Sequence, residues 1–130
     1  MLGSVDFAGQ VVIADLEAGI GTMTRMKEKA VDGVLVVVEP TPRAVQVGVR
    51  AAELARDKAL GTIFVIANRV GSDGDLAIIR AAFPDEDVLV VPDDEAIVRA
   101  ERDGVAPLDA EPGAPAVRAL VEIADRLAPR

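Results

Sequence analysis

The residues best suited to chemistry on a phosphate are Asp15 and Gly19, which close and follow a short apolar run. Mg²⁺ keeps several waters and takes few carboxylates, so the carboxylate of Asp15 could hold a magnesium-bound water. Gly19 has no side chain, so its backbone could approach a phosphate closely and donate its N–H. The same pair also suits a turn, with Asp15 as a capping residue and Gly19 as the turn glycine. The residue types alone leave both interpretations open.

Polar or turn-forming residues follow the other apolar runs as well, at Glu39, Asn68 and Pro92. In open α/β sheets, ligands bind at the carboxyl ends of the strands, where such residues would gather. Strands must also end in turns, and turns favour the same residue types. Asn68 therefore suits either a ligand contact or a plain turn, and Asp94 suits either a ligand contact or a helix N-cap.

Short apolar runs at residues 11–14, 34–38, 63–67 and 88–91 must position these side chains. Each run is continuous rather than alternating, which is typical of strands buried on both faces. Amphipathic stretches separate the runs, and that alternation predicts a parallel sheet. The sequence therefore predicts a single α/β domain over residues 1–130, with a three-layer, Rossmann-like parallel sheet of about four strands.

The intervening stretches carry helix signals. Thr41 can cap a helix that has Pro42 at its first position. We expect further helices over residues 75–83 and 94–102, and a last one that begins near Pro115. The Pro- and Gly-rich stretch between the last two is expected to be a loop.

Composition excludes several classes of function. The formal net charge of −8 disfavours binding to nucleic acid or to an anionic membrane surface. The chain has neither Cys nor His, which removes disulfides, thiolate nucleophiles and histidine bases. No run is long enough to span a membrane, and no signal peptide is visible, so we expect a cytoplasmic protein.

Four segments of the chain resemble motifs of the MinD/ParA-type P-loop ATPases of the SIMIBI class, in the family's order. Residues 11–20 (VVIADLEAGI) resemble the second-switch strand, and residues 32–43 (DGVLVVVEPTPR) resemble the next strand and its exit. Residues 66–70 (IANRV) resemble the adenine-reading segment, and residues 91–97 (VPDDEAI) resemble the last adenine-side loop. The resemblance covers nearly the whole chain and implies an incomplete P-loop NTPase fold.

The resemblance also implies roles for individual residues. Asp15 would hold Mg²⁺ through water and order the attacking water, and Gly19 would sense the γ-phosphate. Asn68 would hydrogen-bond adenine, and Pro92 with Asp94 would line the base pocket. The implied cofactors are therefore ATP or ADP together with Mg²⁺.

Within that family, the segments at residues 17–19 and 38–43 are most similar to the CooC-like ATPases. That branch assists nickel insertion into carbon monoxide dehydrogenase, so the resemblance implies metallocentre maturation and a client metalloenzyme. The sequence departs from the branch at residues 21–24, and it has no Cys to form the branch's Cys-x-Cys metal-binding pair.

A phosphate-binding loop is the motif that the sequence does not contain. Nucleotide phosphates need a glycine-rich cradle of backbone N–H groups and a Lys, and no Gly-x-x-x-x-Gly-Lys-Ser/Thr motif occurs in the chain. We therefore expect no hydrolysis by the chain alone. A P-loop from another segment or chain, or a second copy, would have to fill the sheet edge or gap that remains. The alternative is a non-catalytic dimerisation or regulatory module derived from this fold.

Overall fold

The computed structural model describes residues 10–16 and 20–128, and within them the chain is an α/β fold. Three parallel strands form one sheet in the order β1-β2-β3. The strands are β1 (Gly33–Val38), β2 (Thr62–Val70) and β3 (Asp87–Pro92). The helices are α1 (Ile20–Met23), α2 (Pro42–Asp57), α3 (Asp73–Ala82), α4 (Glu95–Asp103), α5 (Pro107–Ala110) and α6 (Pro115–Leu127).

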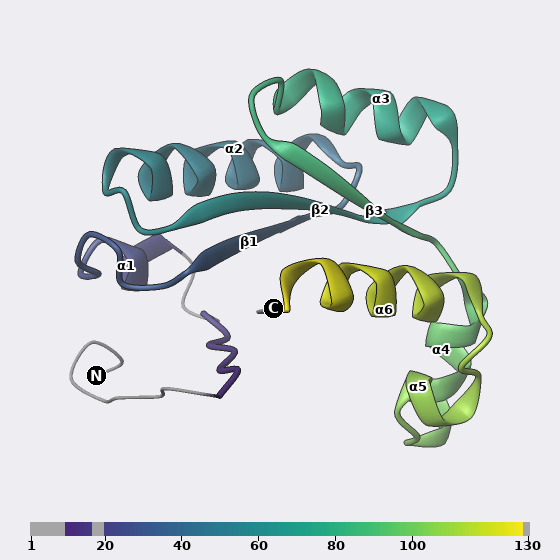
Figure 1. The fold of residues 1–130 in the computed structure, drawn as a ribbon. Helices are drawn as coiled ribbons and strands as arrows, with labels where there is room; N and C mark the ends of the chain where they lie inside the picture. The colour runs from purple at the N-terminus through teal and green to yellow at the C-terminus, as the bar shows by residue number, and fades with distance from the viewer. Residues whose placement is uncertain (1–9, 17–19, 129–130) are drawn as a thin grey trace.

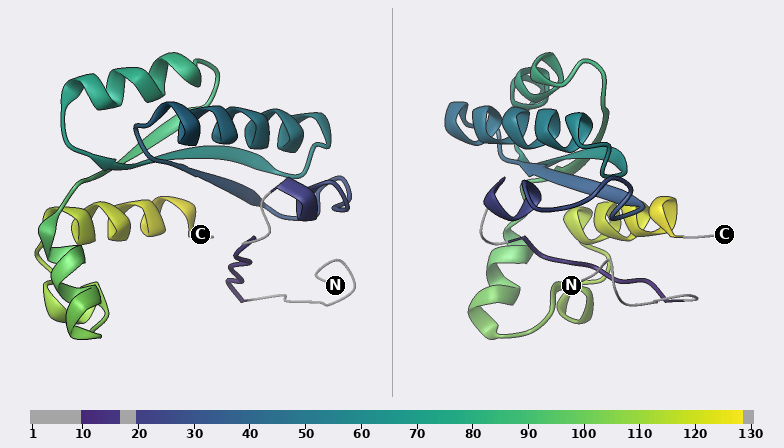
Figure 2. Two further views of the ribbon diagram at one scale, coloured as in Figure 1. Left: turned by 180° about the vertical axis from the view of Figure 1, so that it is seen from behind. Right: turned by 90° about the vertical axis from the view of Figure 1, so that its left-hand side faces the viewer.

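Helices cover both faces of the sheet, which confirms the predicted three layers. Helices α2 and α3 lie on one face and α6 on the other (Figure 1). Figure 2 shows the same layers from behind and from the side. The larger core lies under α2 and α3, and it contains Val36, Val38, Ala52, Val65, Ala67, Ile79 and Phe83. The smaller core joins β2 and β3 to α6 through Ile66, Leu89, Val91 and Ala116.

Local signals account for most helix boundaries. The Thr41 side chain accepts a hydrogen bond from the backbone N–H of Ala44, and Pro42 opens α2 as predicted. Helix α3 begins earlier than predicted, because the side chain of Ser72 accepts from the backbone N–H of Asp75. Helix α4 ends at Gly104, whose φ of 68° places it in the left-handed region that glycine tolerates.

Helix α2 approaches the sheet closely at Gly48. A Cβ atom built on Gly48 would lie 2.6 Å from Cγ2 of Val38 and 3.2 Å from Cζ of Phe83. No side chain fits at that separation without a shift of the stiff Val38, because a valine has two branches on its Cβ. Gly48 therefore fixes how near α2 packs to β1.

The predicted strand at residues 11–14 is wrong. Residues 10–16 form no strand (Figures 1 and 2), although Leu16 at the end of the segment packs against a buried cluster of Met23, Ala55 and Leu60. Val11 is 71% exposed and Ile13 is 86% exposed, so the apolar run is not in the core. A strand needs a neighbour to complete its backbone hydrogen bonds, and this segment has no ladder partner among the described residues. The described sheet therefore has three strands rather than the expected four.

Among the described residues, strand β1 has no neighbouring strand on its outer side, and its face opposite α2 is uncovered. In the described part of the chain β1 pairs only with β2, so its outer row of backbone groups has no sheet partner. On the face opposite α2, Leu35 is 46% exposed and Val37 is 61% exposed. Helix α6 does not shield them, because it packs mainly on β3. We call the outer side of β1, with Leu35 and Val37, the open edge.

Two further expectations concern helices. The stretch between α4 and α6 was expected to be a loop, but it contains the short helix α5, with Pro107 in its first turn. Within the described residues, no helix has both the length and the apolar character needed to cross a membrane.

Candidate functional site

The carboxyl ends of the three strands meet at one edge of the sheet. Val38, the last residue of β1, is paired in register with Ala67 of β2, and Ala67 is paired with Val90 of β3. The residues that follow these positions therefore face the same side of the molecule. They include Glu39, Asn68 and Pro92, which the sequence placed at strand ends, whereas Asp15, also expected there, lies in a segment that forms no strand.

Strand β2 is bulged at this edge, so Asn68 and Arg69 leave the regular ladder. The register between β2 and β3 shifts between Ala67 and Val70, where Val70 is paired with Pro92. Arg69 has a φ of 58°, in the left-handed region that is unfavourable for a residue with a Cβ. The backbone N–H of Asp93 donates to the carbonyl of Val70 at 2.9 Å and closes the irregular segment. Bulges of this kind re-aim side chains and are frequent beside active sites.

The guanidinium of Arg69 lies between two carboxylates from the neighbouring strands. Its Nη1 is 3.5 Å from Oε1 of Glu39, and its Nε is 3.4 Å from Oδ1 of Asp93. The hydrogen bond and charge of Asp93, followed by the charge of Glu39, raise the pKa of Arg69 above its usual value. Arg69 thus connects the ends of all three strands across the bulge.

Asp94 caps two helices at once. Its Oδ1 accepts from the backbone N–H of Ala96 in α4 at 2.9 Å, and its Oδ2 accepts from the backbone N–H of Ala116 in α6 at 3.0 Å. These bonds, the one from Ala116 first, lower the pKa of the Asp94 carboxyl. Both oxygens hold helix starts, so the N-cap interpretation is confirmed. A contact between Asp94 and a base remains a prediction.

Asn68 and Pro92 are half-buried beside the bulge. In the described part of the chain, no hydrogen bond engages the side-chain amide of Asn68, which leaves its donors and acceptor available. An amide can donate to one ring nitrogen of a base and accept from an exocyclic amine. The arrangement therefore suits the adenine contact that the sequence resemblance implies.

Asp15, one of the two expected phosphate-side residues, does not lie at this edge. Asp15 is exposed in the segment outside the sheet, and Gly19 lies outside the described residues. Over residues 10–16 and 20–128, no three Asp or Glu side chains gather as metal ligands would. The metal role of Asp15 remains a prediction.

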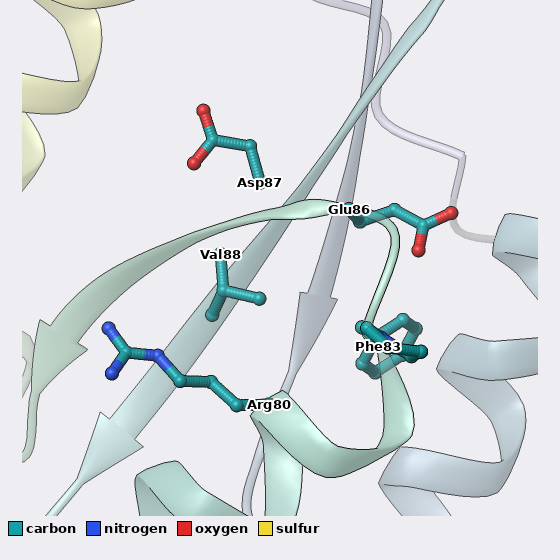
Figure 3. Close-up of a pocket in the computed structure, with 6 residues that line it drawn as sticks. Arg80, Phe83, Glu86, Asp87 and Val88 are labelled. Atoms are coloured by element: carbon teal, nitrogen blue, oxygen red, sulfur yellow. The ribbon is translucent and has the colours of Figure 1, made fainter.

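A shallow cavity of about 320 Å³ lies at the opposite end of β3. It is lined by Arg80, Phe83, Pro84, Glu86, Asp87 and Val88, and Figure 3 shows Arg80 on one side with Glu86 and Asp87 at the start of the strand. Glu86 is paired with Arg56, and Asp87 is paired with Arg126. Because these acids already have partners and the amino ends of parallel strands seldom bind ligands, we assign the cavity no role in the site.

Comparison with known proteins decides the relationship. No family model matches the chain. The carbon monoxide dehydrogenase accessory protein CooC of Rhodospirillum rubrum is 36% identical over 104 residues, which are 79% of this chain and 40% of CooC. The uncharacterised ATP-binding protein MJ0547 of Methanocaldococcus jannaschii is 32% identical over 126 residues, 91% of this chain and 46% of its own length. The cell division ATPase MinD of Pyrococcus furiosus shares the fold with a TM-score of 0.62 and 23% identity, over 76% of this chain and 44% of MinD.

The chain is a relative of CooC with a MinD-like fold. The resemblance stated from the sequence is thereby confirmed, as is the α/β fold class. This CooC relative spans less than half the length of the proteins that it matches, 40% of CooC and 46% of MJ0547.

Sequence reasoning about this CooC relative missed Arg69. The residue lies next to the predicted Asn68 inside the segment at residues 66–70, but no role was expected of it. Its charge could have identified it, because Arg69 is a cation in a segment that was expected to lie beside the acidic strand-end residues Glu39 and Asp93. Its left-handed backbone depends on how β2 is paired with β3, which the local sequence does not encode.

Proposed function

We propose that this chain is the base-binding part of an ATPase-type nucleotide-binding domain. Asn68 hydrogen-bonds the adenine of ATP or ADP, and Pro92 with Asp94 borders the base. The proposal is supported above all by the available Asn68 amide at the carboxyl ends of three parallel strands, in a relative of CooC and of ATP-binding proteins. Asp15 and Gly19 would act on the phosphate side, with Mg²⁺ held through water on Asp15.

We further propose that the phosphate-binding loop comes from another segment or chain. The open edge supports this. A strand added there would complete the outer backbone hydrogen bonds of β1, and a following helix could cover Leu35 and Val37. Burial of an aliphatic side chain stabilises an assembly by about 1.5–3 kcal/mol when it is complete. By itself the chain binds nucleotide weakly and does not hydrolyse it.

The role of the whole assembly would be metallocentre maturation, with a metalloenzyme as its client. This part of the proposal rests on CooC, which is named as an accessory protein of carbon monoxide dehydrogenase. The chain itself has no Cys with which to hold a metal in transit.

The proposal can be tested on one side chain, because Asn68 is the chain's single asparagine. Its NH₂ group gives one pair of signals in a nitrogen–proton NMR spectrum, which Asn68→Ala identifies among the pairs from Gln10 and Gln46. We expect ADP and ATP, with and without Mg²⁺, to shift these signals with a dissociation constant of roughly 0.1–1 mM, about −5.5 to −4.1 kcal/mol. GDP should shift them less, and Asn68→Ala should weaken ADP binding at least about fivefold, by the loss of one buried polar contact.

The outcome also separates the proposal from its alternative. If millimolar ADP and ATP leave the Asn68 signals unmoved, the base-binding assignment fails. A non-catalytic dimerisation or regulatory module would then be the better description. The open edge favours that second candidate, and concentration-dependent self-association measured by light scattering would support it.

A further inference from the structure

Arg69 combines features that stability alone does not explain. Its backbone is left-handed, which is unfavourable for any residue with a Cβ. Its two ion pairs are long and exposed, and exposed pairs contribute little to folding. A residue kept in strained backbone without a compensating gain in stability indicates a functional constraint.

The charges around Asn68 suggest what that constraint is. Glu39 stands beyond the end of β1 and Asp93 beyond the end of β3, so carboxylates flank the bulge that carries Asn68. The chain as a whole carries a net charge of −8. A nucleotide adds several negative charges from its phosphates, and like charges repel over about 10 Å at moderate salt. A cation between the two carboxylates would offset one of their two negative charges and so reduce that repulsion.

We propose that Arg69 is a specificity-determining residue that allows this edge to accept an anionic nucleotide, by offsetting part of the negative charge of Glu39 and Asp93 on either side of Asn68. The inference rests on the proposed nucleotide site and adds a distinction within it. Recognition of the base depends on Asn68, whereas tolerance of the phosphates depends on Arg69. The neutral nucleoside adenosine should therefore bind without need of Arg69.

The chain offers matched variants for the test. Arg69→Asn removes the charge and keeps a residue that tolerates left-handed backbone, so the bulge should survive. Arg69→Lys keeps the positive charge but replaces the planar guanidinium by an ammonium group. Glu39→Gln with Asp93→Asn removes the two carboxylates that Arg69 offsets. Arg126→Asn is the control, because it removes an equal charge from an ion pair with Asp87 at the opposite end of β3.

Adenosine, ADP and ATP would each be titrated into the full chain at low ionic strength and followed by calorimetry, because several of these variants add a second asparagine to the NMR spectrum. We expect Arg69→Asn to weaken the binding of ATP and ADP roughly three- to tenfold and the binding of adenosine less than about twofold. Arg69→Lys should recover most of the loss. When Glu39→Gln and Asp93→Asn are already present, Arg69→Asn should weaken the binding of ATP and ADP by less than about twofold. Added salt should reduce every charge-dependent difference in affinity.

Several results would overturn the inference. Equal weakening of adenosine and ATP by Arg69→Asn would mean that Arg69 shapes the site rather than offsetting charge. Unchanged ATP binding in Arg69→Asn, or an equal loss in Arg126→Asn, would also exclude it while the base-binding proposal stood. If adenosine, ADP and ATP all left wild-type Asn68 unmoved, the proposed function would fail, and this inference with it.

Discussion

Asp94 links the first turns of two helices that are distant in the sequence. Helix α6 has no side-chain cap of its own at Ala114, so the carboxylate of Asp94 supplies the missing acceptor through Ala116. A single substitution at this position therefore leaves backbone donors of both α4 and α6 without partners.

We expect Asp94→Ala to lower the melting temperature by roughly 5–10 °C at pH 7, because a helix N-cap is lost together with a second bond. Circular dichroism should follow the unfolding, since the chain has neither Trp nor Tyr for fluorescence. Asp125→Ala, at an exposed position of α6, should change the melting temperature by less than about 2 °C. Equal shifts in the two variants would contradict the double-cap role.

The pH dependence has a definite sign. The folded chain lowers the pKa of Asp94, so the folded state binds the proton less readily than the unfolded state. The stability that this carboxylate contributes is complete above its unfolded pKa of about 4 and is lost as the pH falls through the lower folded pKa. The difference in the free energy of unfolding between wild type and Asp94→Ala, measured with urea, should therefore become smaller below about pH 4. A difference that grows below about pH 4 would contradict a lowered pKa of Asp94 in the folded chain.

Residue types at strand ends were largely predictable, and their partners were not. Asn68 and Pro92 were expected at the carboxyl edge and lie there. Arg69 and the second bond of Asp94 depend on the packing of segments brought together only by the fold, such as Ala116, which is 22 positions from Asp94. A sequence pattern carries capping and turn chemistry, but it does not carry the register of the neighbouring strand.

Helix α2 shows how one small residue sets the spacing between an element and the sheet. Gly48→Ala gains about 1 kcal/mol of helix propensity. It also forces Val38 to move, and overpacking of a core costs about 1–3 kcal/mol. We expect a net loss of roughly 1 kcal/mol in the free energy of unfolding, measured with urea.

Gly74→Ala is the matched control in the first turn of α3. The nearest atom to its added Cβ would be Oγ of Ser72 at 3.7 Å, an ordinary contact. We expect this variant to be neutral or to gain up to about 1 kcal/mol, because alanine favours helix without a clash. If Gly48→Ala stabilised the chain as much as Gly74→Ala, the close approach of α2 to β1 would not be a constraint.

At the same scale, the segment at residues 11–14 shows the limit of pattern recognition. Its run of Val, Val and Ile is as apolar as that of β1, yet the two segments differ in structure. Strand β1 has β2 beside it, and the earlier segment has no neighbour in the described sheet. Strand propensity measures fit to a sheet that already exists, so a run without a partner cannot express it.

At the scale of the whole molecule, the open edge makes assembly the property most easily disturbed. We expect Val37→Lys to abolish self-association and to block complementation by a P-loop-bearing chain, because a charge on an edge strand opposes further pairing. The melting temperature should fall by less than about 3 °C, since the side chain of Val37 is mostly exposed in the isolated chain. Light scattering across a concentration series would measure the association.

Val98→Lys on α4 is the control for that experiment. Val98 is also an exposed aliphatic residue, but it lies outside the sheet. If Val98→Lys suppressed association as much as Val37→Lys, general solubility rather than the open edge would explain the effect.

The order of the strands also bears on how the protein would assemble as the ribosome makes it. Strands β1, β2 and β3 are neighbours in the same order in which they are synthesised. Each new strand is therefore added on the side away from β1, and no later part of the described sheet has to insert beside it. Once β1, α2 and β2 have emerged, the surface offered to a partner is already formed. A partner could thus be joined during translation, before α6 exists, which would shorten the time that a bare strand is exposed to aggregation.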